Sequence, residues 1–154
     1  MTRRRLVIDA SAALYIASAA RAIPGLDTFD LVAPPNFPSE RTSALSAALY
    51  RGEIPDIPGT MVLDRLESMP VTIVDDGAQH RREALDLAKS VGWAKTDDAE
   101  YVVLARRLGC ALLTTDARLE RGAERIVTIL RPMSLTNGRS RRRPAESLVD
   151  IHFR

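Results

Sequence analysis

The chain has 154 residues, a length typical of one domain, and its 45% hydrophobic and 27% charged residues are ordinary for a folded globular protein. It has one cysteine, two widely separated histidines and no closely spaced glycines, which argues against an internal disulfide, a zinc finger, a histidine-based triad, a phosphate-binding loop and a dinucleotide fingerprint. The net charge of +2 hides an acidic body, with 14 basic and 18 acidic side chains over residues 6–137, between two arginine-rich ends.

The first apolar run, Leu6–Ile8, follows three arginines and is interrupted by Asp9. A charge after only three apolar residues argues against an export signal, and no segment approaches the ~20 apolar residues that span a membrane. Together with the single thiol of Cys110, these features favour a reducing, cytoplasmic location and no membrane partner.

Short apolar runs alternate with helical stretches along the chain. The runs are nearly continuous rather than alternating, which is typical of strands buried on both faces, and they lie at 6–8, 31–33, 71–74, 111–114 and 126–130. Apolar spacing predicts helices over 10–22, 38–51, 58–69, 80–91 and 97–109. This alternation predicts a single α/β domain with an open, mostly parallel sheet of four to five strands and helices on both faces. We place the domain at 1–135 and a basic C-terminal extension at 136–154.

Two of the predicted strands end at an aspartate. Asp9 directly follows the first strand, and Asp116 follows the fourth. In an open α/β sheet, ligands bind beyond the carboxyl ends of the strands, so both carboxylates are candidates for a binding site. The alternative interpretation is that each aspartate caps the next helix, with Ser11 sharing that role with Asp9.

Two more acids face the core side of their predicted helices. Asp97 and Glu100 have the spacing of a helix-capping pair, which makes Asp98 redundant as a cap. The residues four and seven positions after Asp98 are apolar, so its carboxylate is expected to face inward. Glu40 has the same orientation on the second predicted helix. An inward carboxylate needs a partner, because burying an unpaired charge is expensive.

Four carboxylates that converge near the strand ends would resist ionising together unless cations balance them. Two divalent cations would neutralise four carboxylates, and all-oxygen ligation favours Mg²⁺ or Mn²⁺ over zinc. Ions held in this way stabilise the attacking and leaving oxygens of a phosphoryl displacement. The acids therefore predict phosphodiester hydrolysis.

These segments together resemble a PIN domain, and they are most similar to the VapC-type toxins of bacterial toxin–antitoxin pairs. The resemblance rests on Leu6–Ser11, on Ala33-Pro34-Pro35 with Glu40 and Leu45, on Asp98–Ala105, and on Leu113–Asp116, and it extends from about Leu6 to about Leu130. It implies a Mg²⁺- or Mn²⁺-dependent endoribonuclease that forms a homodimer, cleaves RNA and is blocked by the C-terminal segment of a cognate antitoxin. The catalytic and metal-binding residues implied by it are Asp9, Glu40, Asp98 and Asp116.

The chain departs from the family pattern in three places. Asp97 stands where the family often has an aromatic or small residue, and Ala117 and Arg118 supply no further acid after Asp116. The arginines of the extension lie past the usual end of the family, where they could bind RNA backbone, contact a partner or be solvated.

The resemblance and the carboxylate count suggest a role for each site residue. Asp9 and Asp116 are expected to hold the principal ion directly, while Asp98 and Glu40 complete the shell through water or a second ion and orient the attacking water. Hydroxyls near the strand ends, those of Ser11 and Thr114, are candidates for fixing the carboxylates, with capping as the alternative role. Water attack would leave a 5′-phosphate and a 3′-hydroxyl.

Other function classes fit the residues less well. A phosphatase of the haloacid-dehalogenase type requires a second aspartate where Ser11 stands, and a receiver domain requires a lysine near the last strand, whereas the only lysines are Lys89 and Lys95. A non-cleaving PIN-like module that binds RNA or protein remains an alternative, as does a solitary RNA-processing nuclease.

Overall fold

The computed structural model describes residues 2–54 and 57–135, which form a five-stranded sheet in which all neighbouring strands are parallel. The strand order is β3-β2-β1-β4-β5. The strands are β1 (Arg4–Ile8), β2 (Phe29–Ala33), β3 (Val71–Ile73), β4 (Ala111–Leu113) and β5 (Ile129–Leu130). The expected open parallel sheet of an α/β domain is therefore confirmed, while the expected extension 136–154 lies outside the described residues.

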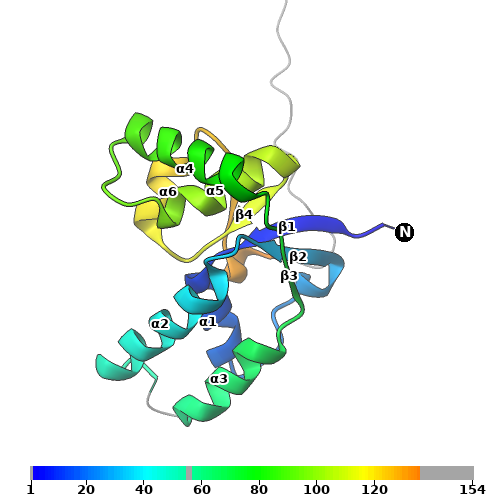
Figure 1. Ribbon diagram of the computed structural model, residues 1–154. Helices are drawn as coiled ribbons and strands as arrows, with labels where there is room; N and C mark the ends of the chain where they lie inside the picture. The colour runs from blue at the N-terminus through cyan, green and yellow to red at the C-terminus, as the bar shows by residue number, and fades with distance from the viewer. Residues whose placement is uncertain (1, 55–56, 136–154) are drawn as a thin grey trace, which may run out of the picture.

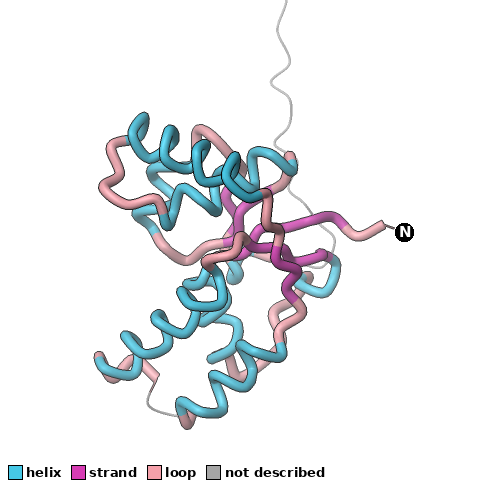
Figure 2. Tube along the Cα trace, viewed as in Figure 1, coloured by secondary structure: helices cyan, strands magenta, loops and turns pink. Residues whose placement is uncertain are grey.

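Helices cover both faces of the sheet (Figure 1, Figure 2). They are α1 (Ala10–Ser18), α2 (Phe37–Tyr50), α3 (Gly59–Ser68), α4 (Gly77–Val91), α5 (Asp97–Leu108) and α6 (Ala117–Ala123), with short 3₁₀ turns at Leu26–Thr28 and Pro132–Ser134. Helices α1, α2 and α3 pack against one another on one side, and α4 and α5 pack together with α6 on the other (Figure 1). Within residues 2–54 and 57–135, every helix is too short or too polar to cross a membrane.

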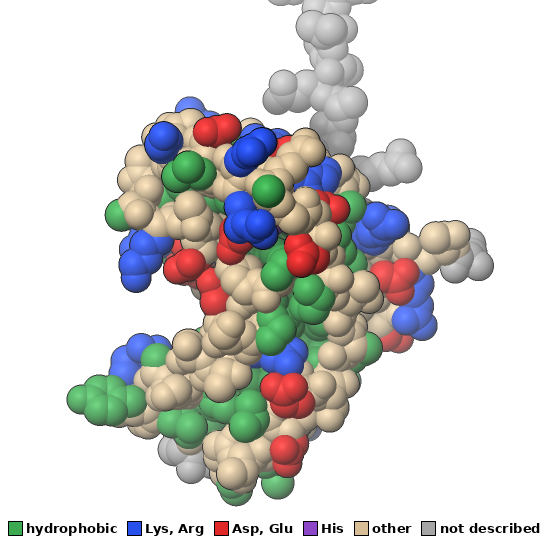
Figure 3. Space-filling view, viewed as in Figure 1, with side chains coloured by type: hydrophobic (Ala, Val, Ile, Leu, Met, Phe, Trp, Pro, Cys, Tyr) green, Lys and Arg blue, Asp and Glu red, His purple; other side chains and the backbone are tan. Residues whose placement is uncertain are grey.

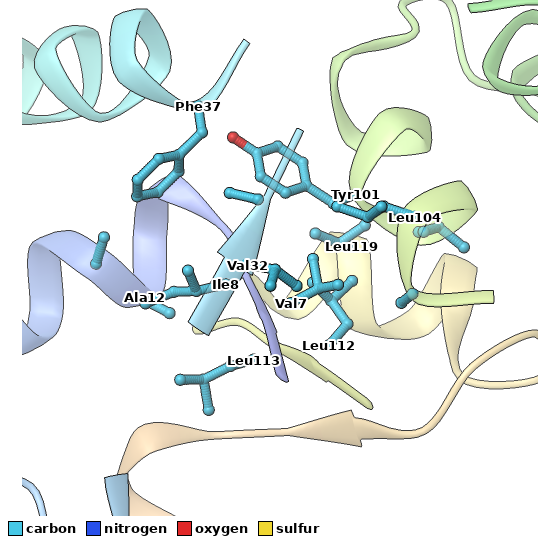
Figure 4. Packing of buried hydrophobic residues seen from close by; sticks show 14 of the residues in the cluster. Val7, Ile8, Ala12, Val32, Phe37, Tyr101, Leu104, Leu112, Leu113 and Leu119 are labelled. Atoms are coloured by element: carbon cyan, nitrogen blue, oxygen red, sulfur yellow. The ribbon is translucent and has the colours of Figure 1, made fainter. Parts of the chain in front are cut away.

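The hydrophobic core is centred on β1. Its last three residues, Leu6–Ile8, are 0% exposed, because helices cover both faces of this central strand. Figure 4 shows Val7 and Leu112 from adjacent strands packing near Leu104 of α5 and Leu119 of α6. A central strand buried in this way is a rigid support for the residue that follows it.

The chain reverses its direction across the sheet between β1 and β4. It proceeds outward from β1 through β2 to β3, then returns to place β4 on the other side of β1, with Ile8 opposite Leu113. In open α/β sheets, the crevice beyond the carboxyl ends of two such strands is the usual ligand site. The segments that follow Ile8 and Leu113 are therefore the place where the topology predicts a site.

The first helix is shorter than the sequence predicted. A helix was expected over 10–22, but α1 ends at Ser18 and Ala19 is extended. Arg65 from α3 explains the early end, because its Nη1 donates a hydrogen bond to the carbonyl oxygen of Ala17 at 3.1 Å. A tertiary contact thus satisfies a carbonyl at the end of this helix.

The region after β4 also differs from the prediction. Helix α6 was not expected. Only Leu119 and Ala123 are buried along its 7 residues, so the sequence shows no helical spacing of apolar residues there. The last strand is limited to Ile129–Leu130, whereas the apolar run suggested 126–130. Residues 124–128 instead turn back from the end of α6 to the sheet.

Candidate active site

Asp9 and Asp116 lie at the carboxyl ends of the neighbouring strands β1 and β4. The backbone N–H of Asp9 donates to the carbonyl of Leu113 at 3.2 Å, which extends the pairing of the two strands by one residue. Asp9 Oδ1 accepts from the N–H of Ala12 at 2.8 Å and caps α1. Asp116 Oδ1 accepts from the N–H of Arg118 at 2.8 Å and caps α6. Both aspartates are therefore helix caps, as the capping interpretation of the sequence predicted. Both also lie at the crevice beyond the carboxyl ends of β1 and β4.

Two hydroxyls hold the carboxylate of Asp9. Ser11 Oγ donates to Asp9 Oδ1 at 2.8 Å, and Thr114 Oγ1 donates to Asp9 Oδ2. The same hydroxyls accept hydrogen bonds from the next segment, Ser11 from the N–H of Thr115 at 3.1 Å and Thr114 from the N–H of Asp116 at 3.0 Å. This network links the first aspartate to the backbone of the second and restricts the rotamer of Asp9.

Glu40 lies in the first turn of α2 and is held from two sides. Asn36 Nδ2 donates to Glu40 Oε1 at 2.9 Å, and the phenol of Tyr101 on α5 donates to Glu40 Oε2 at 2.9 Å. Tyr101 is 1% exposed and reaches from α5 toward Phe37 at the start of α2 (Figure 4). The sequence analysis missed both donors, although Asn36 lies one helical turn before Glu40 and Tyr101 follows Asp98 by three residues on the same helix.

Asp98 lies in the first turn of α5 and is half-buried, as its inward orientation predicted, whereas Asp97 is exposed. The expected capping role of Asp97 is wrong. Helix α5 begins at Asp97, one residue earlier than a capping role for Asp97 would require. Thr96 therefore occupies the N-cap position, and its side chain makes no capping hydrogen bond. Asp97, Asp98 and Glu100 all lie in the first turn, where negative charge favours the helix dipole.

The carboxylates of the crevice oppose one another's ionisation. Burial raises the pKa of Asp9 to about 6, and the charge of Asp98 acts in the same direction. Burial also raises the pKa of Asp98, with Asp116 adding to the effect and Arg118 opposing it. The pKa of Glu40 is raised by burial and by the charges of Asp97 and Asp98, while hydrogen bonds from Tyr101 and Asn36 lower it. Asp98 therefore interacts electrostatically with each of the other three candidate acids.

The donor set fits a hard, water-rich divalent cation better than zinc. Its oxygens come from carboxylates and hydroxyls, and Asp9 remains largely ionised at neutral pH despite its burial. Within residues 2–54 and 57–135, no three His, Cys, Asp or Glu side chains are close enough to hold one ion together. Mg²⁺ tolerates such a site, because it usually keeps several waters and uses one or two carboxylates.

The acidic crevice lies in a hollow between the two helical layers. Figure 3 shows this hollow with acidic side chains on its wall and basic side chains at both lips, over α6 and over the end of α2. Arg118 in α6 and Arg51 at the end of α2 are both exposed. Such an arrangement suits a polyanion that crosses the carboxylates between two basic contacts.

An all-parallel α/β sheet with buried acids at its switch point defines a class of proteins that bind ligands at the carboxyl edge of the sheet. The PIN domain family matches residues 6–125, which is most of the chain, so this protein belongs to the PIN domain family. Domains of this family are generally nucleases, and they typically use divalent metal ions. Among the curated proteins, none matches this chain.

One solved structure supports the fold, and two others are similar at TM-scores below 0.5. The crystal structure of PAE2754 from Pyrobaculum aerophilum is similar with a TM-score of 0.65 and 19% identity over 87% of this chain and 95% of that chain. A PilT N-terminus domain protein, SSO1118 from Sulfolobus solfataricus, gives a TM-score of 0.42 and 17% identity over 85% and 89% of the two chains. FitAB bound to an IR36 DNA fragment gives 0.48 and 13% identity over 87% and 99%. At these identities, the likeness concerns the fold alone.

Proposed function

We propose that this PIN domain is a Mg²⁺- or Mn²⁺-dependent endoribonuclease and the toxin of a toxin–antitoxin pair. The observation that carries the nuclease proposal is the position of Asp9 and Asp116 at the carboxyl ends of two adjacent strands, with Asp98 close enough to raise the pKa of Asp9. A folded protein tolerates such mutual repulsion where a bound cation balances it.

In this proposal, Asp9 and Asp116 hold the principal ion, and Asp98 and Glu40 complete its shell through water or a second ion. When bound, the ion supplies charge stabilisation to the phosphoryl group and lowers the pKa of a water. Ser11 and Thr114 keep Asp9 in position, because both hydroxyls donate to its carboxylate.

Glu40 orients the attacking water, with its own carboxylate fixed by Asn36 and Tyr101. Attack on phosphorus forms a P–O bond to the water oxygen and breaks the P–O3′ bond, and the 3′-oxygen takes up a proton. The products are a 5′-phosphate and a 3′-hydroxyl.

The remaining parts of the proposal follow from the resemblance to VapC-type toxins. We expect a cytoplasmic homodimer whose cognate antitoxin covers the acidic crevice with its C-terminal segment. The nuclease unit is placed at 1–135, with 136–154 as a basic C-terminal extension. A chain truncated after Leu135 is therefore expected to fold.

The test is the cleavage of a structured RNA pool in Mg²⁺ or Mn²⁺, with EDTA and with the Asp98→Asn variant. Cleavage that requires the metal and is lost in Asp98→Asn would support the nuclease. The matched control is Asp64→Asn on α3, an exposed aspartate outside the crevice, which should cut like the wild type. Metal-dependent cleavage that persists in Asp98→Asn would refute the site assignment.

The toxin role needs its own measurement. Induced expression in a bacterial host should arrest growth for the wild type and for Asp64→Asn, but not for Asp98→Asn. Cleavage in the test tube without growth arrest would favour a solitary RNA-processing nuclease. A folded protein that binds RNA but does not cut it would favour the non-cleaving module.

A further inference from the structure

A cavity opens beside Asp9, between α1 and α2, and the roles proposed above do not use it. It has a volume of about 340 Å³, and its walls include Ser11, Tyr15, Ala44, Arg51 and Thr115. This volume lies at the lower end of the ~300–1,000 Å³ typical of small-molecule pockets. Ser11 and Thr115 also belong to the hydrogen bonds around Asp9, so the cavity begins at the edge of the acidic crevice.

Tyr15 gives the cavity an aromatic wall. It lies one helical turn after Ser11 on α1, and residues at this spacing share a helix face. Its side chain is 40% exposed, while Ala12 and Ala13 bury the opposite part of the helix at 0% exposure. Tyr15 is therefore not needed to fill the core, and its ring can offer a flat apolar face to a ligand.

Helix α2 contributes two small side chains to the lining. These are Ala44 and Ala48, and larger residues at these positions would fill the cavity. Ala44 is half-buried and Ala48 is 1% exposed. An aromatic ring together with methyl groups is a suitable slot for one flat, unpaired base, since bases in single strands stack on aromatic side chains.

Arg51 at the rim is paired with Glu53, which also lines the cavity. Its Nε donates to Glu53 Oε1 at 2.5 Å and its Nη2 to Glu53 Oε2 at 3.2 Å, so the two charges compensate each other. Arg118 of α6 is close enough to Asp98 to lower its pKa. Figure 3 shows basic side chains on both sides of the hollow, so a strand that crosses the carboxylates would meet positive charge there.

We propose that the cavity between α1 and α2 is a subsite for the base of an unpaired nucleotide next to the scissile phosphate, with the base stacked on Tyr15. This inference rests on the proposed nuclease function and adds to it a residue that positions the substrate. A base that is paired inside a duplex cannot enter a pocket between two helices.

The experiment compares Tyr15→Ala, Tyr15→Phe and Ala44→Leu, each also placed in the Asp98→Asn background to prevent cleavage. The matched control is Tyr50→Ala, because Tyr50 is a tyrosine of α2 that is 94% exposed and lies outside the cavity wall. Circular dichroism and thermal denaturation establish that each variant is folded. Binding of a fluorescein-labelled ten-nucleotide single-stranded RNA is measured by anisotropy, and cleavage positions are mapped on an RNA pool.

We expect Tyr15→Ala to weaken RNA binding at least fivefold, which corresponds to about 1 kcal/mol. Ala44→Leu, which fills the slot from the other side, should have a similar effect. Tyr15→Phe keeps the ring and should bind like the parent, as should Tyr50→Ala. In the active background, Tyr15→Ala should raise KM more than it lowers kcat and should weaken the nucleotide preference beside the cut.

The outcomes separate this inference from the function on which it rests. If Tyr15→Ala and Ala44→Leu cut and bind like the parent, the nuclease stands and the subsite is wrong. If the wild type does not cut but its RNA binding depends on Tyr15 and the slot, the subsite stands and the hydrolytic function is wrong. If the wild type neither binds nor cuts RNA, both are wrong.

Discussion

Removing the charge of Asp9 should stabilise the metal-free protein relative to the wild type increasingly as the pH rises. Burial raises the pKa of Asp9 from 3.8 to about 6, so the folded state binds a proton more tightly than the unfolded state does. Stability from this group is therefore present at low pH and is lost as pH rises from the unfolded pKa through the folded one. This difference between the folded and unfolded pKa of Asp9 corresponds to about 3 kcal/mol of unfolding free energy between low and high pH.

Asp9→Asn is the suitable perturbation, because asparagine keeps an oxygen that can cap the helix and carries no charge. It loses the oxygen that accepts from Thr114, a cost that does not vary with pH. Its stability advantage over the wild type should grow by about 2 kcal/mol between pH 4.5 and pH 7.5. For a chain of this size, that is roughly 4–8 °C in Tm. The advantage at neutral pH should shrink when Mg²⁺ is added, since the ion stabilises only the wild-type carboxylate.

The assay is urea and thermal denaturation in EDTA at four pH values from 4.5 to 7.5. Asp64→Asn is the control, because this aspartate is exposed on α3 and its difference from the wild type should not change with pH. A constant difference between Asp9→Asn and the wild type over this range would refute the reasoning. So would an advantage that decreases as pH rises.

Three further predictions concern other parts of the site and its support. Tyr101→Phe removes the hydrogen bond to Glu40 and should reduce cleavage about 10–100-fold while costing about 1 kcal/mol in urea denaturation; cleavage equal to the wild type would contradict the positioning role. Mg²⁺ should raise the Tm of the wild type in a thermal-shift assay but raise that of Asp98→Asn much less, and an equal rise would place the ion elsewhere. Gly122→Ala should destabilise the protein by about 1–3 kcal/mol and change its tryptophan fluorescence, because a Cβ at this position would lie 2.4 Å from Cζ2 of Trp93. Unchanged stability and emission would show that the Trp93 ring moves freely.

The sequence was sufficient to predict the sheet and the two aspartates at its edge. Leu6–Ile8 is a continuous apolar run because the strand is buried on both faces, and the residue that follows such a strand must lie at its carboxyl end. The inward position of Asp98 was predictable for a similar reason, since the helical period relates it to buried residues on the same helix. Local patterns were enough wherever a residue's position follows from its own strand or helix.

The contacts between distant segments could not be predicted in this way. The hydrogen bond from Tyr101 to Glu40 joins residues 61 positions apart on two helices, and no spacing within either helix indicates it. The same holds for Thr114 and Asp9, which are 105 positions apart. The early end of α1 depends on Arg65 from α3. The missed features are therefore tertiary contacts, whose partners are determined by packing.

Helix capping and ion binding are compatible roles for the strand-end aspartates. The bonds from Ala12 to Asp9 and from Arg118 to Asp116 both end on Oδ1, so each cap fixes the carboxylate plane while the group keeps its charge. Carboxylates fixed in this way lose little conformational freedom when an ion binds, which favours affinity for the ion. In the absence of the ion, the desolvation that raises the pKa of Asp9 disfavours its negative charge. A preformed anionic site therefore lowers the stability of the metal-free protein, as is common at functional sites.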